Sequence, residues 1–280
     1  MKERAYAKIN LALNVKGRRE DGYHELEMIM VPIDFYDEIE MIPSDHMNYH
    51  CNRPYIVFNE KNTIVKTVKY FRENYGIRQN YRITLKKHIP TRAGMAGGSA
   101  DAAALIRLYD RAHHLHLSDE EKKKAALTIG ADVLFCVYQR PALVGGIGEE
   151  LRFFKPSVPF RILLVKPRKG VSTAESFRSL NLEACDHPDV YALQEALEAG
   201  DYERSISLMG NSLEEPSLRL LPVIGEIKRD CLSLGEDYAL MSGSGSTVFV
   251  LSQNGKTLEK IERKMKERGF FVRKTRILDV

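Results

Sequence analysis

The chain has 280 residues, of which 44% are apolar and 29% are charged. Domains usually span about 100–200 residues, so this length predicts two domains or one large two-lobed unit with a sizeable core. Nineteen glycines and eleven prolines are ordinary numbers and exclude collagen-like and low-complexity classes. The net charge of +4 is too balanced to require a nucleic-acid partner, although it suits an anionic small molecule.

The four cysteines lie far apart and form no CxxC pair. This spacing is typical of free thiols in a reducing compartment, rather than of a disulfide framework or a zinc site. No stretch approaches eighteen apolar residues, and the first residues lack the apolar core of a signal peptide. We therefore expect a cytoplasmic protein without a membrane or nucleic-acid partner.

The first half of the chain contains both strand and helix patterns. Residues 5–15 have period two, which predicts a half-buried strand with Lys8 and Asn10 side by side on its polar face. The later elements predicted for this half are a β-rich stretch over 26–42 interrupted at Pro32, a helix from the Asn62 cap to Gly76, a strand over 81–87, a helix over 99–114, a helix from the Ser118–Glu121 capping box to Gly130, and a buried strand over 133–138.

The second half is richer in helices. Its predicted elements are a strand over 161–167, helices over 172–180, 188–199, 202–213 and 222–234, two strands joined by a glycine/serine loop over 238–252, a helix over 256–268 and a strand over 270–278. Pro156 and Pro159 interrupt the pattern of strands and helices near residue 155. We therefore predict a domain boundary there, between an N-terminal lobe over 1–155 and a C-terminal lobe over 156–280. Because strands and helices mix without strict alternation, the predicted class is α+β.

The densest glycine cluster lies between a predicted strand and a predicted helix, within Pro90–Ser99. Small residues let the backbone approach an anion, and the helix N-terminus offers unsatisfied N–H groups with a partial positive charge. Ser99 adds a hydroxyl for a phosphate oxygen or a magnesium ion. This context favours a phosphate-binding loop over a plain glycine-rich turn.

Other catalytic signatures are absent. The only Gly-Lys-Thr, at 255–257, has Val250 where a Walker A loop needs glycine, and no GxGxxG or protein-kinase motif occurs. Asp132 sits just before an apolar run and is either a turn-stabilising or a catalytic carboxylate. If it met Lys8, the lysine would keep it ionised and could stabilise a transferred phosphoryl group.

Three stretches together resemble the GHMP kinases, a superfamily of small-molecule kinases. They are residues 7–11, residues 89–103 and Met241–Gly245, and they occur in the family's order over nearly the whole chain. Asp21-Gly22-Tyr23-His24 and Gly130–Val133 further resemble the branch that phosphorylates the 2-hydroxyl of 4-diphosphocytidyl-2-C-methyl-D-erythritol in non-mevalonate isoprenoid synthesis. The segments at 170–173 and 187–190 support that branch.

The resemblance implies two α/β lobes, the N-terminal one like ribosomal protein S5 domain 2, with the active site in the cleft between them. It implies ATP and Mg²⁺, a cytidine-diphosphate-linked sugar alcohol as the small-molecule substrate, and a monomer or homodimer. Lys8 and Asp132 would be catalytic, and Ser99 would bind the metal. ATP would be bound by Asn62, Ile64, Lys87, Pro90, Thr91, Arg92, Ala93, Gly94, Met95, Ala96, Gly97, Gly98, Ser99 and Ala100. The acceptor would be bound by Asn10, Tyr23, His24, Phe177, Gly243 and Ser244. Tyr23 and Phe177 would lie on the two faces of its cytosine, and His24 at the edge of that ring.

Several positions depart from the family pattern. Tyr6 replaces a proline, Leu134 stands where a proline commonly follows Asp-Val, Ile147 replaces an arginine, Ala100 lacks a hydroxyl, and Ala96 stands in the glycine-rich loop. We expect Ala96 to keep a negative φ, since its methyl group disfavours the alternative. The alternatives left open are a GHMP kinase with another acceptor, such as mevalonate or homoserine, a weakly active paralogue, and a nucleic-acid-binding module.

Overall fold

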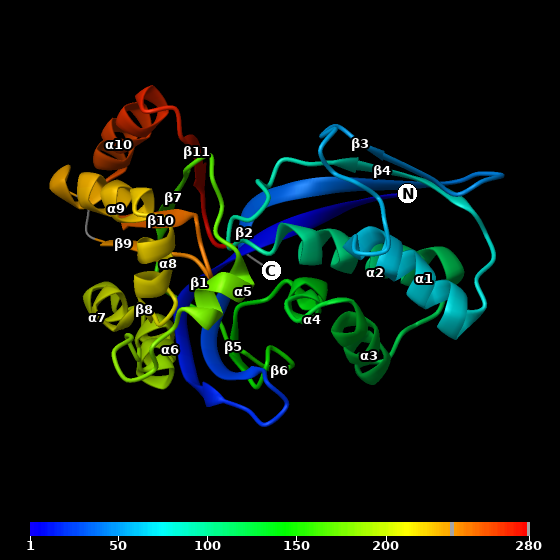
Figure 1. Ribbon diagram of the computed structural model, residues 1–280, viewed down its shortest axis with the longest axis horizontal. Helices are drawn as coiled ribbons and strands as arrows, with labels where there is room; N and C mark the ends of the chain where they lie inside the picture. The colour runs from blue at the N-terminus through cyan, green and yellow to red at the C-terminus, as the bar shows by residue number, and fades with distance from the viewer. Residues whose placement is uncertain (236–237, 279–280) are drawn as a thin grey trace. The chain divides into compact units, whose positions relative to one another are not determined.

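The computed structural model describes residues 1–235 and 238–278 (Figure 1). They form two compact units, each assembled from separate stretches of the chain. Unit 1 consists of Met1–Ala7, Phe35–Thr91 and Ala96–Gln139, and unit 2 of Lys8–Asp34, Arg92–Met95 and the chain from Arg140 onward. The division of the sequence near residue 155 stays a prediction, because these units are defined by spatial contact and are discontinuous in sequence.

Unit 1 is a small sheet with a group of helices. Strands β1 (Lys2–Arg18) and β2 (His24–Pro43) are long, and each contributes residues to both units. The other elements of unit 1 are β3 (Asn48–Cys51), α1 (Thr63–Tyr75), β4 (Tyr81–Lys86), α2 (Gly97–His113), α3 (Asp119–Ile129) and α4 (Val133–Tyr138). Strand β4 pairs antiparallel with β2 and parallel with β3, and the four helices gather on one side of β3 and β4 (Figure 1).

Two helices of unit 1 begin and end where the sequence predicts. The Asn62 side chain accepts a hydrogen bond from the Ile64 amide at 2.9 Å, and Gly76 ends α1 in the left-handed conformation. Ser118 and Glu121 exchange the two bonds of a capping box at the start of α3. These predictions are confirmed because capping depends on residues that are close together in the sequence.

Aromatic stacking joins α1 to α2. The ring of Phe71 lies parallel to that of Tyr109, with 4.6 Å between centroids, and both side chains are buried. Burial raises the pKa of Tyr109 well above its usual range, since a phenolate could not be solvated there. This pair fixes the first helix against the helix that carries the glycine-rich loop.

Unit 2 contains a separate antiparallel sheet in the order β11-β7-β10-β9. Its elements, beyond its parts of β1 and β2, are β5 (Ala142–Gly145), β6 (Glu150–Phe153), β7 (Arg161–Lys166), α5 (Thr173–Arg178), α6 (Val190–Ala199), α7 (Tyr202–Leu208), β8 (Gly210–Asn211), α8 (Glu214–Leu220), α9 (Val223–Ser233), β9 (Tyr238–Met241), β10 (Val248–Ser252), α10 (Gly255–Glu267) and β11 (Phe271–Thr275). Strand β5 pairs with β2 and β6, and β8 lies parallel to β1.

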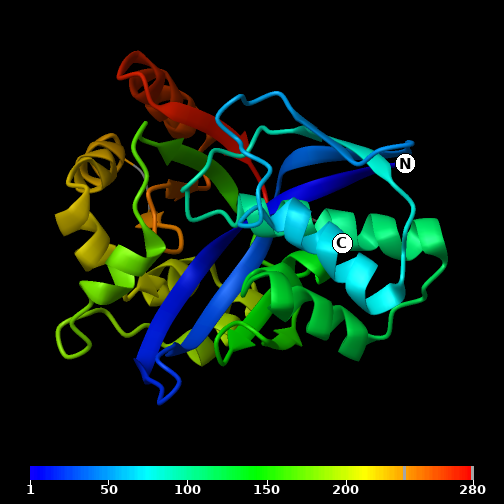
Figure 2. The same ribbon diagram turned by 45° about the vertical axis from the view of Figure 1, so that its right-hand side comes forward.

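Helix α10 packs on this second sheet through its apolar stripe. Leu258, Ile261 and Met265 are all buried, as their spacing predicts. Figure 2 shows the helix running beside β11, which follows it in the chain. No helix in the described part of the chain is long and apolar enough to cross a membrane.

Three predictions about the elements are wrong. The helix predicted over 202–213 ends at Leu208, and Gly210–Asn211 instead form β8, which pairs with β1. Residues 133–138 form α4 rather than a strand, and this helix is covered by α2 and α3, so that all of Val133–Val137 is buried. A short run that is apolar on every side looks the same in a buried strand and a buried helix. Strand β2 also runs without interruption through Pro32, whose carbonyl accepts a hydrogen bond from the Leu278 amide at 2.9 Å.

Replacement of Phe71 by alanine should lower the free energy of unfolding by about 3–5 kcal/mol, because it removes a buried ring and leaves a cavity between α1 and α2. Urea denaturation measures the change. Val57→Ala, at a side chain that is 64% exposed, serves as the control and should change stability by less than about 0.5 kcal/mol. Equal effects of both substitutions would contradict this packing.

Candidate active site

The glycine-rich loop lies between β4 and α2 and turns through three left-handed residues. Arg92, Gly94 and Ala96 have φ angles of 50°, 68° and 53°. The negative φ expected for Ala96 is therefore wrong: this alanine ends the loop in the left-handed region and stands at the N-cap of α2. Among the described residues no side chain caps α2, so the N–H groups of its first turn are open to an anion.

Within unit 2, the centre of the loop is pressed against the segment that joins β9 to β10. A Cβ atom at Gly94 would collide with the Ser242 carbonyl oxygen and lie 3.0 Å from the Gly245 amide nitrogen. The Ser242 hydroxyl donates to the Gly94 carbonyl at 2.9 Å, and the Thr247 amide donates to Ala93 at 3.3 Å. Only glycine fits at position 94, because both the positive φ and the close approach exclude a side chain.

Strand β1 holds the other side of this loop segment. The Lys8 amide donates to the Met95 carbonyl at 3.3 Å, and the Asn10 amide donates to the Ser242 hydroxyl at 3.3 Å. On the same strand face the Lys8 ammonium donates to the Asn10 side-chain oxygen at 2.6 Å. This contact confirms that Lys8 and Asn10 lie side by side, and both side chains are buried.

Asp132 lies in unit 1 at the N-terminus of α4. It is half-buried, with φ −77° and ψ −4°, and its carbonyl accepts from the Cys136 amide at 3.2 Å. Gly130, two residues before it, is the C-cap of α3. Lys8 belongs to the other unit, so the pairing of the two side chains stays a prediction.

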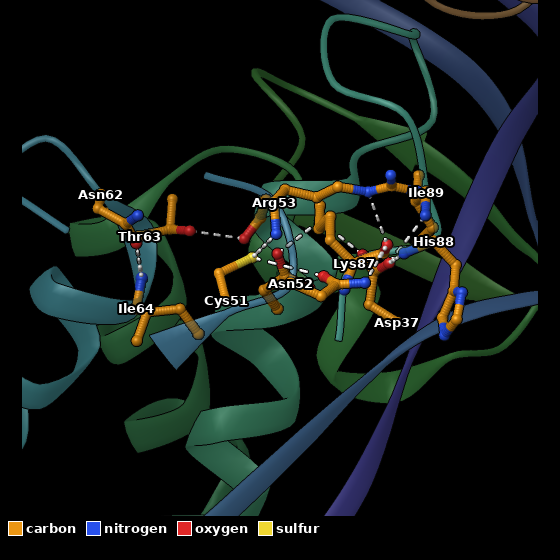
Figure 3. Close-up of polar contacts among 12 residues, drawn as sticks. Asp37, Cys51, Asn52, Arg53, Asn62, Thr63, Ile64, Lys87, His88 and Ile89 are labelled. Carbon is orange, nitrogen blue, oxygen red and sulfur yellow. Dashed lines mark hydrogen bonds and ion pairs between the residues drawn. The ribbon is translucent and has the colours of Figure 1, made fainter. Parts of the chain in front are cut away.

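Lys87 is buried between two carboxylates of unit 1. Its ammonium lies 2.5 Å from Asp37 Oδ2 on β2 (Figure 3) and 2.6 Å from Asp101 Oδ2 on α2. Burial alone would lower the pKa of Lys87, but the charges of Asp101 and Asp37 outweigh it and raise this pKa. Burial is also the main cause that raises the pKa of Asp101, to about 7. Asp37 was not among the site residues predicted from sequence.

The start of α1 reaches the first turn of α2. The Thr63 hydroxyl donates to the Gly98 carbonyl at 2.7 Å, next to Asn62 and Ile64 at the helix cap (Figure 3). The backbone of Lys87 is held by the Asn52 side chain, which accepts from its amide at 2.7 Å and donates to its carbonyl at 3.3 Å. No sequence spacing indicated Thr63 or Asn52, because both contacts join segments about 35 residues apart.

The aromatic residues predicted to bind the acceptor lie in unit 2. The rings of His24 and Phe177 are stacked, with 4.8 Å between centroids and 25° between planes. Burial, followed by the charge of Arg18, lowers the pKa of His24, which favours the neutral ring near neutral pH. Tyr23 is 61% exposed. Phe177 therefore stacks on His24 here, whereas the sequence prediction pairs it with Tyr23 across a base.

Two further predicted residues lie on the β9–β10 connection. The Ser244 hydroxyl is 2.8 Å from that of Thr173, and the carbonyl of Gly243 accepts from the Asn211 side chain at 2.8 Å. Asn211 also donates to the Met241 carbonyl at 2.8 Å, so one buried amide supports both ends of the turn. The sequence motif at 241–245 indicated the loop but not the residue on β8 that holds it.

Known proteins match this chain over most of its length. The family described as "GHMP kinases N terminal domain" matches residues 62–140, and "GHMP kinases C terminal" matches residues 193–270. The chain is 39% identical to the 4-diphosphocytidyl-2-C-methyl-D-erythritol kinase of Bacillus subtilis (strain 168), covering 96% of this chain and 93% of that protein. It is 43% identical to the kinase of the same name from Clostridium beijerinckii, over 90% of each.

The chain belongs to the GHMP kinase family. A crystal structure of 4-(cytidine 5'-diphospho)-2C-methyl-D-erythritol kinase is 31% identical to it and superposes with a TM-score of 0.82, covering 100% of both chains. The α+β fold expected from sequence is thereby confirmed for this GHMP kinase, which is a small-molecule kinase. The roles of individual side chains are proposals and are argued below.

In this GHMP kinase, Gly94→Ala should lower kcat/KM for ATP by about 100-fold, because the added methyl pushes the loop off Ser242 and a shift of about 1 Å in a catalytic group costs about that factor. Steady-state kinetics at varied ATP concentration measure it. Gly17→Ala is the control, since a Cβ there meets nothing within 4 Å, and it should leave the constants unchanged. Unaltered ATP kinetics in Gly94→Ala would contradict the tight contact.

Proposed function

We propose that this GHMP kinase transfers the γ-phosphoryl group of ATP to the 2-hydroxyl of 4-diphosphocytidyl-2-C-methyl-D-erythritol. The observation that carries the proposal is the likeness to kinases of that name, at 39–43% identity over at least 90% of both chains. An assay of ATP consumption with this acceptor tests it directly, beside mevalonate, phosphomevalonate and homoserine. Turnover of one of those three instead would replace the proposed acceptor while retaining a kinase.

The uncapped first turn of α2 supports the place proposed for the ATP phosphates. Backbone N–H groups at a helix N-terminus carry partial positive charge and suit an anion, and the left-handed Ala96 leaves them uncovered. The loop from Pro90 to Ala100 would wrap the triphosphate. The adenine would lie near Asn62, Ile64 and Lys87. Because the side chain of Lys87 is buried below the loop, it would support the loop rather than contact the nucleotide directly.

Magnesium is proposed as the metal that accompanies ATP. Residues 1–235 and 238–278 contain no group of three His, Cys, Asp or Glu side chains that could hold an ion by themselves. Mg²⁺ bound to a nucleotide needs only one or two protein oxygens, since phosphates and water supply the rest. The hydroxyl of Ser99, in the first turn of α2, fits this limited requirement and would be the protein ligand.

Lys8 and Asp132 are proposed as the catalytic residues. Asp132 would orient the acceptor hydroxyl and take its proton as the oxygen attacks the γ-phosphorus and the bond to the ADP oxygen breaks. Lys8 would stabilise the charge on the transferred group. Its ammonium is bound by Asn10 at 2.6 Å, which fixes a long flexible side chain in one orientation before the substrate arrives.

The cytosine ring of the acceptor is proposed to stack on the aromatic residues of unit 2. Tyr23, His24 and Phe177 offer the ring faces, and the neutral imidazole of His24 can read the polar edge of a base. Asn10, Gly243 and Ser244 would contact the rest of the acceptor. We further propose that the kinase works in the cytoplasm as a monomer or homodimer, and its four free cysteines suit a reducing compartment.

Asp132→Asn should lower kcat by about 10²–10⁴-fold, because the amide keeps the shape of the carboxylate but cannot accept the proton. Binding of ATP should be unchanged when it is measured by calorimetry. Asp45→Asn, at an exposed carboxylate, is the matched control and should retain full turnover. Wild-type kcat in Asp132→Asn would remove this residue from the mechanism.

Phe177→Ala should raise KM for the cytidine-bearing acceptor roughly 5- to 150-fold, the equivalent of about 1–3 kcal/mol of lost stacking. The KM for ATP should stay the same. Tyr191→Ala, which removes a half-exposed aromatic ring elsewhere in unit 2, controls for general effects of truncation. A parallel rise in both Michaelis constants would show that Phe177 supports the fold instead of the acceptor.

A further inference from the structure

Three ionisable side chains from three separate segments meet in the interior of unit 1. Asp37 comes from β2, Lys87 follows β4, and Asp101 lies on α2; each is at most 3% exposed. Lys87 donates to both carboxylates, and Asp37 Oδ1 also accepts from the amides of His88 at 2.5 Å and Ile89 at 2.8 Å. We call these three side chains the buried triad.

The triad lies directly beneath the first turn of α2. A Cβ atom at Gly97 would lie 3.1 Å from Lys87 Nζ and 3.0 Å from Ile89 Cγ2, so the backbone of this turn rests on the ammonium without a side chain between them. Asp101 is four residues further along the same helix, which is about one turn. The ammonium is therefore held against α2 by a carboxylate of α2 itself.

Stability alone is a poor explanation for such a cluster. Removing charges from water costs several kcal/mol per ion, and well-packed apolar residues in place of a buried ion pair are often neutral or stabilising. In addition, Asp101 Oδ1 has no hydrogen-bond partner among the described residues although it is buried. What charge-assisted hydrogen bonds supply is fixed geometry, since they are short and directional.

We propose that Asp101, acting through Lys87, is a positioning residue that sets the first turn of α2 against the sheet for binding the triphosphate. Asp37 anchors the ammonium to the backbone after β4, and Asp101 anchors the helix to the ammonium. The position of the N–H groups at Gly97 and Gly98 then depends on this buried hydrogen bond as well as on the bond from the Thr63 hydroxyl to the Gly98 carbonyl. This inference rests on the proposed function, because it assumes that ATP phosphates bind at that turn.

Asp101→Leu and Asp101→Asn test the proposal, with a non-hydrolysable β,γ-imido analogue of ATP as the ligand in calorimetry with MgCl₂. Asparagine keeps an oxygen that accepts from Lys87, whereas leucine fills similar space and accepts nothing. We expect Asp101→Leu to weaken binding at least 10-fold and Asp101→Asn to stay within about threefold of the wild type. The KM for the acceptor should remain unchanged in both variants.

Asp110→Leu is the matched control on the same helix. Its carboxylate accepts from the Leu117 amide at 3.0 Å beyond the C-terminal end of α2, so its loss should lower the melting temperature without weakening nucleotide binding. If Asp101→Leu does not fold, Gly97→Ala takes its place. Its methyl presses on Lys87 and Ile89, and we expect the same selective loss of nucleotide affinity.

The measured nucleotide affinities either support or overturn the positioning role of Asp101. Wild-type affinity in Asp101→Leu, or in Gly97→Ala where that variant replaces it, overturns the positioning role. A loss in Asp101→Asn as large as in Asp101→Leu also overturns it, since the retained oxygen would then be irrelevant. If the wild-type protein itself fails to bind the analogue, the proposed ATP site is wrong and the inference falls with it, whereas failure with the acceptor alone leaves the inference intact.

Discussion

For the phosphate site proposed above, the first turn of α2 must expose bare backbone N–H groups and yet keep them in one place. A side-chain cap would occupy the donors, so the turn has to be held by contacts that do not use them. In unit 1 these are the hydroxyl of Thr63 on the Gly98 carbonyl and the ammonium of Lys87 below Gly97. In unit 2 the preceding loop is fixed through carbonyl groups of Ala93, Gly94 and Met95. All of these contacts leave the donors of the first turn free.

Features that depend on neighbouring residues could be predicted from the sequence. The alternation of β1 placed Lys8 beside Asn10, and the capping residues Asn62 and Ser118 marked the starts of α1 and α3. The glycine-rich loop was placed between a strand and a helix for the same reason. Local conformational preferences and side-chain spacing are enough to predict these features, and the structure has each of them.

Features that depend on distant residues could not be predicted in this way. The helix at 133–138 is set by the packing of α2 and α3 around an apolar run, and the left-handed Ala96 is held by the loop that it ends. Asp37 lies on a strand and Asp101 on a helix, and only the folded structure places both carboxylates within hydrogen-bond distance of Lys87. A single sequence has no spacing that links positions 37, 87 and 101.

The stacked rings of His24 and Phe177 bear on how selective this kinase can be among ring compounds. Parting an aromatic pair costs about 0.5–1.5 kcal/mol, which is a large share of the roughly 1–3 kcal/mol that one stacked base gains. A planar ligand that inserts between the rings therefore gains little from stacking alone. A ring that lies on the outer face of the pair keeps the pair intact and gains the full amount. If a base binds here as proposed, the choice among flat ligands falls to hydrogen bonds at the ring edge, where a neutral His24 has both a donor and an acceptor.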